Sequence, residues 1–458
     1  MRPSVPYAIR SDSQSIAIPT QESAKREGRP VVCIFAGLLV VGVLMRLFVV
    51  AAAGNRLNAP WGGGGDTSAY ALLAHNLATG KGYGYAGHPT AFRAPAYPIE
   101  LGALMKIFGG RAFAADRVVQ FGMGLLIALL CGAIAGRLCG RKALLPSITV
   151  ALLCPTLIVM TGEILTETSA TLIATLFLYC LVRFVQEHSW VTLACASVLV
   201  GIAALVRFNM AAFGIVVLGL VLCQHKIPKW GGVALAILLP AVVTGPWLIR
   251  NFLVFHTAPT FSTESGPAAV MGMLTPQGRA MPGDSERLRE ALGWVPPADL
   301  ETNDASRNNL GDESDLNRKA WHVAFQLWRQ TGWKLIPLET EKLSFFWLST
   351  DQLLWTHSFR PVVRTARAGG VLIYWGLLAL GIAGWFRLRK FEPQIARVFL
   401  LYAALITILH LPFDMNTRLR MPFTDGLLAV LVGIWSLRFH AIDRGAEVVL
   451  AALGGATE

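Results

Sequence analysis

Long apolar runs alternate with short polar turns along most of the chain. Several runs reach the roughly 20 residues that a helix needs to cross about 30 Å of hydrocarbon. The pattern therefore predicts an all-α polytopic membrane protein with about ten transmembrane helices. The predicted spans are 31–53, 118–136, 143–161, 168–185, 190–206, 208–223, 231–249, 371–386, 396–412 and 421–437.

The apolar run 190–223 predicts a helical hairpin rather than one long helix. A single helix of this length would extend roughly 51 Å at about 1.5 Å per residue, which far exceeds the thickness of the bilayer. The turn is expected near Arg207-Phe208-Asn209. No signal-peptidase pattern follows the first apolar segment, so that segment is expected to be retained as a helix.

Composition supports the membrane interpretation, because 54% of the 458 residues are apolar and only 15% are charged. The seven cysteines lie between Cys33 and Cys223, in or beside apolar segments, without a disulfide framework or a C-x-x-C zinc spacing. The basic residues behind the net charge of +12 are scattered over loops and lack the interleaved aromatic residues of a nucleic-acid platform. We attribute the excess mainly to topology and anionic lipid.

Lysines and arginines cluster in loops that fall on one side of a ten-span chain, and the positive-inside rule assigns that side to the cytoplasm. These loops are 1–30, 137–142, 224–230 and 387–397. The remaining turns would then be extracytoplasmic, and they hold Asp66, Glu163, Glu167, Arg207, Arg250, Asn251, Asp414, Arg418 and Arg420. Ionisable residues set against membrane helices would thus meet at one face, as a membrane-embedded site requires.

This topology divides the chain into five parts. They are a cytoplasmic tail (1–30), a membrane core (31–249) with its first extracytoplasmic loop (54–117), an extracytoplasmic segment (250–370), C-terminal transmembrane helices (371–437) and a second cytoplasmic tail (438–458). Segment 250–370 has the composition of a solvated loop that returns through interfacial helices. Its stretch Asp312-Glu313-Ser314-Asp315 is interpreted as a solvated acidic patch.

The first extracytoplasmic loop predicts two amphipathic interfacial helices joined by an extended segment. Asp66 or Thr67 can cap the first helix, whose apolar face is formed by Tyr70, Leu73, Ala74 and Leu77. Three prolines keep 88–98 extended, and 99–108 is the second helix. After the four glycines of Trp61-Gly62-Gly63-Gly64-Gly65, this arrangement can hold Asp66 and Arg93 above the bilayer core.

Nucleotide-driven chemistry has no sequence signature in this chain. There is no D-x-D motif for a metal-bound nucleotide sugar, no Walker A, no G-x-S-x-G and no H-E-x-x-H. His75, His88, His256 and His410 share no metal-ligand spacing, so no cofactor is expected, with a divalent metal as the open alternative.

Several motifs, in this order, resemble the GT-C superfamily of polyprenyl-phosphate-sugar-dependent glycosyltransferases, and within it the family-39-like relatives of protein mannosyltransferases and aminoarabinose transferases. They are Gly65-Asp66 with Tyr70; Gly80-Lys81-Gly82-Tyr83; Arg93-Ala94-Pro95-Ala96-Tyr97-Pro98; Thr166-Glu167; Leu205-Val206-Arg207; Pro246-Trp247-Leu248-Ile249-Arg250-Asn251; and Arg418-Leu419-Arg420-Met421-Pro422. The likeness runs from about residue 31 to 437. Ala96 stands where the family commonly has glycine, and either Arg418 or Arg420 corresponds to the late arginine.

The resemblance implies a GT-C fold, a donor whose sugar is carried on a membrane-embedded lipid phosphate, an acceptor outside the cytoplasm and transfer with inversion. It implies that Asp66 is catalytic, that Glu167 matches an acidic residue at the start of a helix, and that Arg93 binds phosphate. The plasma membrane of a bacterium is the implied location. The sugar, the lipid length and the acceptor, whether glycolipid, polysaccharide or protein, stay undetermined.

The chemistry of such a transfer asks for a base at the acceptor hydroxyl and fixed cations at the departing phosphate. Asp66 fits the base, and Glu167 is the second candidate catalytic residue, which could orient the acceptor or share the base role. The alternative is a helix cap for Asp66 and a helix-dipole role for Glu167. Arg93, Arg207, Arg250 and Arg420 are the candidate phosphate ligands, with snorkelling to lipid headgroups as their alternative. Further candidate substrate contacts are Tyr70, Lys81, Tyr83, Tyr97, Glu163, Asn251 and Arg418.

A transporter or flippase of lipid-linked sugars is the alternative function. It could grip phosphate with the same arginines but would need no base. The partners expected in either case are a polyprenyl-phosphate sugar and membrane lipids, and not nucleic acid.

Overall fold

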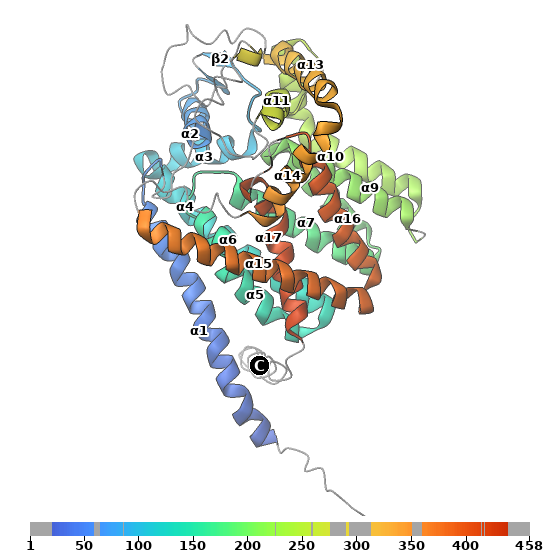
Figure 1. The fold of residues 1–458 in the computed structure, drawn as a ribbon. Helices are drawn as coiled ribbons and strands as arrows, with labels where there is room; N and C mark the ends of the chain where they lie inside the picture. Colours follow the sequence, from blue (N-terminus) through green and yellow to red (C-terminus); the bar gives the residue numbers. More distant parts are fainter. Residues whose placement is uncertain are drawn as a thin grey trace, which may run out of the picture.

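The structure is a computed structural model, and it describes residues 21–58, 65–85, 87–224, 226–257, 260–274, 290–292, 313–349, 360–413, 415 and 417–437. These residues form a helical bundle with a layer of shorter helices at one end (Figure 1). One two-residue hairpin, β1 (Gly84–Tyr85) and β2 (His88–Pro89), interrupts the helices. Residues 61–64, which include three of the four hinge glycines, and both terminal tails beyond 21–437 lie outside the described residues.

Seven helical segments of the described chain are long and apolar enough to cross a membrane: Cys33–Ala53, Ala96–Cys139, Glu167–Glu187, Lys229–Phe255, Gly369–Phe391, Pro393–His410 and Thr417–Ser436. They belong to α1 (Gln21–Ala53), α3 (Ala96–Phe108) with α4 (Ala112–Cys139), α7 (Glu167–Glu187), α10 (Lys229–Phe255), α15 (Arg360–Phe391), α16 (Pro393–His410) and α17 (Thr417–Ser436). The chain is a multi-pass membrane protein, with fewer full-length spans than the ten predicted.

The three other predicted spans are helical but short. α8 (Trp190–Val206) and α9 (Phe213–Cys223), the latter preceded by the 3-10 turn η3 (Phe208–Ala212), form the predicted hairpin with Arg207 at its turn. The predicted span 143–161 is divided into α5 (Leu144–Leu153) and α6 (Pro155–Met160). Cys154 between them is extended, with ψ of 116°, because the residue before a proline is disfavoured in the α region.

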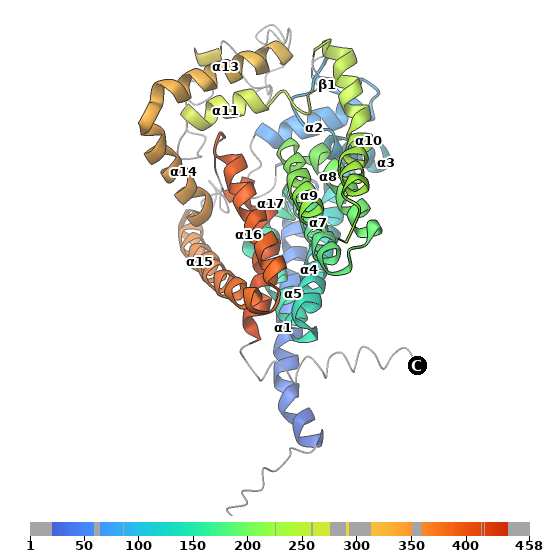
Figure 2. The same cartoon turned by 90° about the vertical axis from the view of Figure 1, so that its right-hand side faces the viewer.

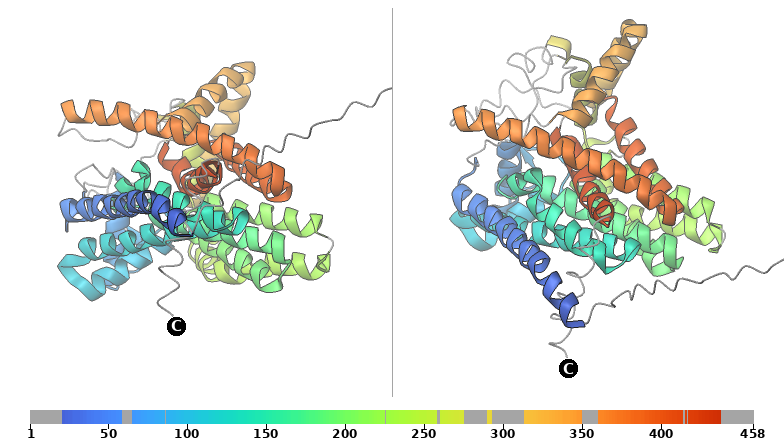
Figure 3. Two further views of the ribbon diagram at one scale, coloured as in Figure 1. Left: turned by 90° about the horizontal axis from the view of Figure 1, so that it is seen from below. Right: turned by 60° about the horizontal axis from the view of Figure 1, so that its bottom comes forward.

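Helix α17 lies at the centre of the bundle, where it packs on α4, α5, α7 and α15. Figure 3 shows it nearly end-on between α15 and the helices on the opposite side. Its close contact with α15 depends on a glycine, since a Cβ on Gly384 would lie 1.9 Å from the backbone oxygen of Leu431. Small residues commonly allow such close approach between membrane helices. In contrast, α1 and α10 are mostly exposed at the periphery, where lipid would surround them.

The layer at the end of the bundle contains α2 (Gly65–Ala78), α3, α11 (Ser265–Leu274), α13 (Glu313–Thr331) and α14 (Leu335–Leu348), as Figure 2 shows. The two helices predicted in the first loop are confirmed. Their apolar faces pack on each other, with Tyr70, Ala74, Tyr97 and Leu101 in one buried cluster. The second helix nevertheless does not stand apart from the bundle, because only the 3-10 turn η1 (Gly109–Arg111) separates α3 from α4.

Glu313 ties this layer to the extended segment that we call the strap (residues 90–95). Its carboxylate accepts hydrogen bonds from the Thr90 hydroxyl, the Ala91 amide at 3.0 Å and the Thr263 hydroxyl at 2.9 Å. The interpretation of 312–315 as a solvated patch is therefore wrong for Glu313, which is 4% exposed; Asp312 lies outside the described residues. Burial raises the pKa of Glu313, while its three donors oppose that rise.

Candidate functional site

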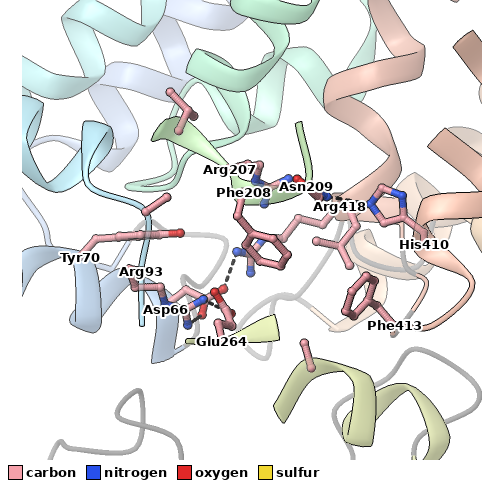
Figure 4. A pocket seen from close by; sticks show the side chains of 14 residues that line it. Asp66, Tyr70, Arg93, Arg207, Phe208, Asn209, Glu264, His410, Phe413 and Arg418 are labelled. Atoms are coloured by element: carbon pink, nitrogen blue, oxygen red, sulfur yellow. Dashed lines mark hydrogen bonds and ion pairs between the residues drawn. The ribbon is translucent and has the colours of Figure 1, made fainter. Parts of the chain in front are cut away.

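A pocket of about 260 Å³ lies between the end of the bundle and the overlying layer. It is formed by α2, the strap, the α8–η3 junction, the start of α11 and the facing ends of α16 and α17 (Figure 4). The lining residues are Asp66, Tyr70, Arg93, Ala94, Val206, Arg207, Phe208, Asn209, Glu264, Ala268, His410, Phe413, Arg418 and Leu419. The predicted outer turns thus converge on one face.

Asp66 lies in the first turn of α2, and each of its carboxylate oxygens is paired with a different arginine. Oδ1 accepts from Arg93 and Oδ2 from Arg418. The carboxylate therefore faces the pocket rather than acting as a simple helix cap. Burial raises the pKa of Asp66, but the two guanidinium groups outweigh it and hold that pKa well below its usual range.

Arg93 is positioned by the strap and is almost fully buried. One of its terminal nitrogens donates to Asp66 and the other to Glu264, and its guanidinium lies 5.6 Å from the centre of the Tyr70 ring. Burial lowers the pKa of Arg93, but the two carboxylates reverse that effect and raise it. Its Nε is buried without a hydrogen-bond partner among the described residues.

Glu264 is a pocket carboxylate that sequence reasoning missed. It follows Ser262, whose hydroxyl donates to the backbone oxygen of Phe92 at 2.6 Å, so this segment is fastened to the strap. Burial raises the pKa of Glu264, and Arg93 opposes the rise. A sequence signal existed, since Glu264 is the lone acidic or basic residue (Asp, Glu, Lys or Arg) between positions 251 and 278.

Arg418 links Asp66 to a second acid, Glu167, at the first position of α7. Oε1 of Glu167 accepts from Arg418 Nε and from Arg207 Nη2, the latter at 2.9 Å. Arg207 also donates to the Thr166 hydroxyl at 3.0 Å. Its Nη1 is buried and has no hydrogen-bond partner within the part of the chain that the structure describes. The result is a continuous chain of alternating charges, with unused donor capacity at Arg207.

Three predicted contacts support the strap instead of lining the pocket. Arg250 donates to the backbone oxygens of Thr90 at 2.7 Å and Tyr83 at 2.9 Å. Asn251 donates to the Thr260 oxygen at 2.8 Å and accepts from Arg250 at 2.9 Å. The Tyr83 hydroxyl donates to the Arg93 backbone oxygen at 2.9 Å. Arg250 therefore acts on Arg93 only indirectly, through the strap, and lies outside the pocket lining.

Arg420 is the predicted phosphate ligand whose position differs most from the expectation. It is fully buried, donates to the backbone oxygens of Phe346 at 2.7 Å and Trp347 at 3.1 Å, and packs 4.1 Å from the centre of the Tyr374 ring. Arg418 reaches the pocket in its place. The two side chains diverge because residues two apart on a helix lie on different faces.

The remaining predicted contacts are also outside the pocket lining. Tyr97 is buried and donates to Asp116 at 3.1 Å, while Lys81 is exposed. Glu163 lies in the turn before α7, where its backbone oxygen accepts from Gln120 at 2.7 Å. Burial raises the pKa of Glu163 to about 7, against the opposing effect of Arg117 and Arg418.

Uncharged residues form the side of the pocket nearest α16. Asn209 Nδ2 lies 3.1 Å from His410 Nε2, and His410 Nδ1 lies 2.7 Å from the Ile406 backbone oxygen. The rings of Phe208 and Phe413 meet edge to face at 6.3 Å. Sequence reasoning considered His410 only as a metal ligand, and within the described ranges no three His, Cys, Asp or Glu side chains group together as a metal site would.

Residues 89–249 match the family model described as dolichyl-phosphate-mannose-protein mannosyltransferase. This segment contains Arg93, Glu167 and Arg207. No curated protein matches the chain.

Among solved structures, the chain is similar to the Archaeoglobus fulgidus oligosaccharyltransferase in complex with zinc and sulfate. The TM-score is 0.50 at 13% identity, over 91% of this chain and 51% of the other. This chain thus spans about half the length of that protein, and the likeness concerns the fold. ArnT from Cupriavidus metallidurans bound to undecaprenyl phosphate gives a TM-score of 0.39 at 16% identity, over 88% of this chain and 78% of ArnT.

The family match agrees with the resemblance carried by the sequence motifs, and the archaeal structure agrees with the expected fold. Residues 89–249 are therefore similar to the dolichyl-phosphate-mannose-protein mannosyltransferase family.

Proposed function

We propose that this protein transfers a sugar, with inversion, from a polyprenyl-phosphate donor to a hydroxyl group on an extracytoplasmic glycolipid, polysaccharide or protein. The observation that carries the proposal is the position of Asp66, a carboxylate held between Arg93 and Arg418 in a pocket at the end of a membrane bundle. The plasma membrane of a bacterium is the proposed location, with the pocket on the outer face.

In the proposed reaction the acceptor oxygen attacks the anomeric carbon of the sugar. The bond between that carbon and the phosphate oxygen breaks, the hydroxyl proton passes to Asp66, and the lipid phosphate leaves with its bonding electron pair. Attack from the side opposite the phosphate inverts the anomeric centre. Asp66 serves as the general base, and the guanidinium groups stabilise the negative charge that develops on phosphate.

Donor binding would also make Asp66 a better base. The two paired arginines hold the pKa of Asp66 low, which makes it a poor proton acceptor. A phosphate group would compete with this carboxylate for Arg93 and Arg418, since both guanidinium groups can donate to either anion. The pKa of Asp66 would then rise toward the range in which it takes up a proton as the new bond forms.

Arg207 and Glu167 complete the proposed site. Nη1 of Arg207 has no partner within the described ranges and offers a donor to phosphate. Glu167 holds Arg207 and Arg418 through a single oxygen, so its proposed role is to position these two cations rather than to accept the proton.

Proteoliposomes containing the purified protein test this function against the transport alternative. They would be supplied with polyprenyl-phosphate hexoses labelled in the sugar and with an envelope extract as acceptor. Release of free polyprenyl phosphate together with a covalently labelled product supports transfer. Movement of intact donor between leaflets, without cleavage of the sugar–phosphate bond, would instead identify a transporter.

A further inference from the structure

The pocket has a charged part and an uncharged part. The charged part consists of Asp66, Arg93, Arg207, Glu264 and Arg418, whereas Phe208, Asn209, His410 and Phe413 form the uncharged part (Figure 4). The proposed function uses only the charged part. The uncharged part contains the hydrogen-bonded pair Asn209 and His410. The contacts of His410 determine which of the two side chains is the donor.

The donor and acceptor roles in this pair follow from the Ile406 backbone oxygen, which can only accept a hydrogen bond. His410 Nδ1, 2.7 Å away, must therefore carry the proton. The imidazole is 2% exposed and packs on the rings of Phe346 and Phe423, and no carboxylate of the described chain is hydrogen-bonded to it. In the neutral ring that such surroundings favour, Nε2 is the acceptor, and Asn209 Nδ2 donates to it across 3.1 Å.

This arrangement leaves the other end of the Asn209 amide as a pure acceptor. Its Oδ1 is buried and has no hydrogen-bond partner in the described part of the molecule. A buried acceptor without a partner is unfavourable, so a ligand that supplies a donor gains a hydrogen bond at little desolvation cost to the protein. An anionic oxygen would be repelled by the same atom.

We propose that Asn209 Oδ1 accepts a hydrogen bond from a hydroxyl group of the transferred sugar. The rings of Phe208 and Phe413 beside the amide offer apolar surface to the C–H face of a sugar ring. Phosphate is directed to the guanidinium groups of the charged part. This assignment rests on the proposed function and adds a specificity-determining residue to it.

Two kinds of equilibrium-binding probe separate the sugar contact from the phosphate contact. One is undecaprenyl phosphate, and the other is undecaprenyl phosphate that carries mannose, glucose or galactose. In the wild type, at least one hexose-bearing lipid should bind more tightly than the sugarless lipid. Asn209→Leu, similar in size but without the amide, should lower that affinity by roughly tenfold and change the affinity for undecaprenyl phosphate by less than about twofold. Asn58→Leu is the matched control, because Asn58 is exposed and outside the pocket lining.

Three outcomes would overturn the assignment. The wild type could bind no hexose-bearing lipid more tightly than undecaprenyl phosphate, or Asn209→Leu could keep that tighter binding. Asn209→Leu could also lose equal affinity for both kinds of probe. Failure of the proposed function is detected separately, in the proteoliposome assay, where the sugar–phosphate bond of the donor would not be cleaved.

His410 is inferred to be a positioning residue that fixes the Asn209 amide. His410→Phe should preserve ring packing while it frees the amide to rotate, so the hexose-dependent gain should fall. The double variant combines His410→Phe with Asn209→Leu. Its extra affinity for hexose-bearing lipid over undecaprenyl phosphate should be no smaller than in Asn209→Leu alone, since both changes remove the same contact. Losses that simply add would show that His410 acts through packing and would refute its positioning role.

Discussion

The Asp66 carboxylate forms an ion pair with the Arg418 guanidinium, although 352 positions separate the two residues in the sequence. The contact joins the first turn of α2 to the first turn of α17 and leaves Arg418 able to reach Glu167 as well. An arginine fork can serve two carboxylates at once, which a lysine ammonium does less well. This relationship defines the proposed reaction centre and the variants that test it.

Asp66→Asn should reduce sugar transfer by roughly 10²- to 10⁴-fold, the usual contribution of a general base. The amide still accepts a hydrogen bond from one arginine, so the amount of folded protein in the membrane should not change. Turnover is measured as release of polyprenyl phosphate from labelled donor. Asp315→Asn, at an exposed position of α13, is the control, and near-normal turnover of Asp66→Asn would exclude Asp66 as the base.

Arg418→Lys and Arg420→Lys should affect different properties, although the two arginines are separated by a single residue. Arg418→Lys should lower turnover at least about tenfold with little change in Tm, because one ammonium cannot replace the fork between Asp66 and Glu167. Arg420→Lys should cost about 1–3 kcal/mol of stability through its buried carbonyl partners and keep turnover per folded molecule. Thermal unfolding and donor turnover of both variants check this, and the reverse pattern would make Arg420 the functional arginine.

Glu264→Gln should tighten the binding of undecaprenyl phosphate by roughly three- to tenfold. The change removes a negative charge that competes for Arg93, while the amide oxygen can still accept a hydrogen bond. Added salt should diminish the gain. Glu341→Gln, at an exposed position of α14, should leave binding unchanged. Weaker binding by Glu264→Gln would mean that the charge of Glu264 is needed to hold Arg93 in place.

Glu163→Gln should stabilise the protein at alkaline but not at acidic pH. Burial raises the pKa of Glu163 from 4.5 to about 7, so the folded state binds the proton more tightly than the unfolded state. Ionisation therefore removes stability progressively as the pH rises from about 4.5 to about 7, and about 3 kcal/mol is lost above that range. The Tm of the variant should exceed that of the wild type by several degrees at pH near 8 and converge with it near pH 4.5. A Tm difference between Glu163→Gln and the wild type that does not change with pH would contradict ionisation of Glu163 as its cause.

Gly384→Ala should destabilise the contact between α15 and α17. The added methyl group would meet the Leu431 backbone oxygen, which cannot move without displacing the central helix. Gly376→Ala on the same helix has open space around it and should be neutral or slightly stabilising, since alanine favours helix. Comparison of the two Tm values isolates the steric effect from helix propensity. Equal values would show that the helices separate at no cost.

The sequence anticipated several of the charged residues that the structure joins by ion pairs at the pocket. Asp66 and Arg93 stand out as charges in an apolar chain, and Glu167 and Arg207 stand out as charges at helix ends, so each could be selected without a structure. Arg250 and Arg420 met the same criterion but serve other contacts. A charged side chain at the end of a membrane helix indicates that the side chain has an interaction partner. The sequence does not reveal which residue or ligand that partner is.

By itself, the sequence determined the helical membrane fold, since apolar periodicity and length are local properties that lipid acts on directly. It also predicted that the turns holding Asp66, Arg207 and Arg418 meet at one face, and these residues line one pocket. Tertiary structure alone decided that Arg418 rather than Arg420 meets Asp66, that Glu264 pairs with Arg93 and that His410 orients Asn209. These contacts depend on the rotation of each helix about its axis, which is set by packing against neighbours that are distant in the sequence.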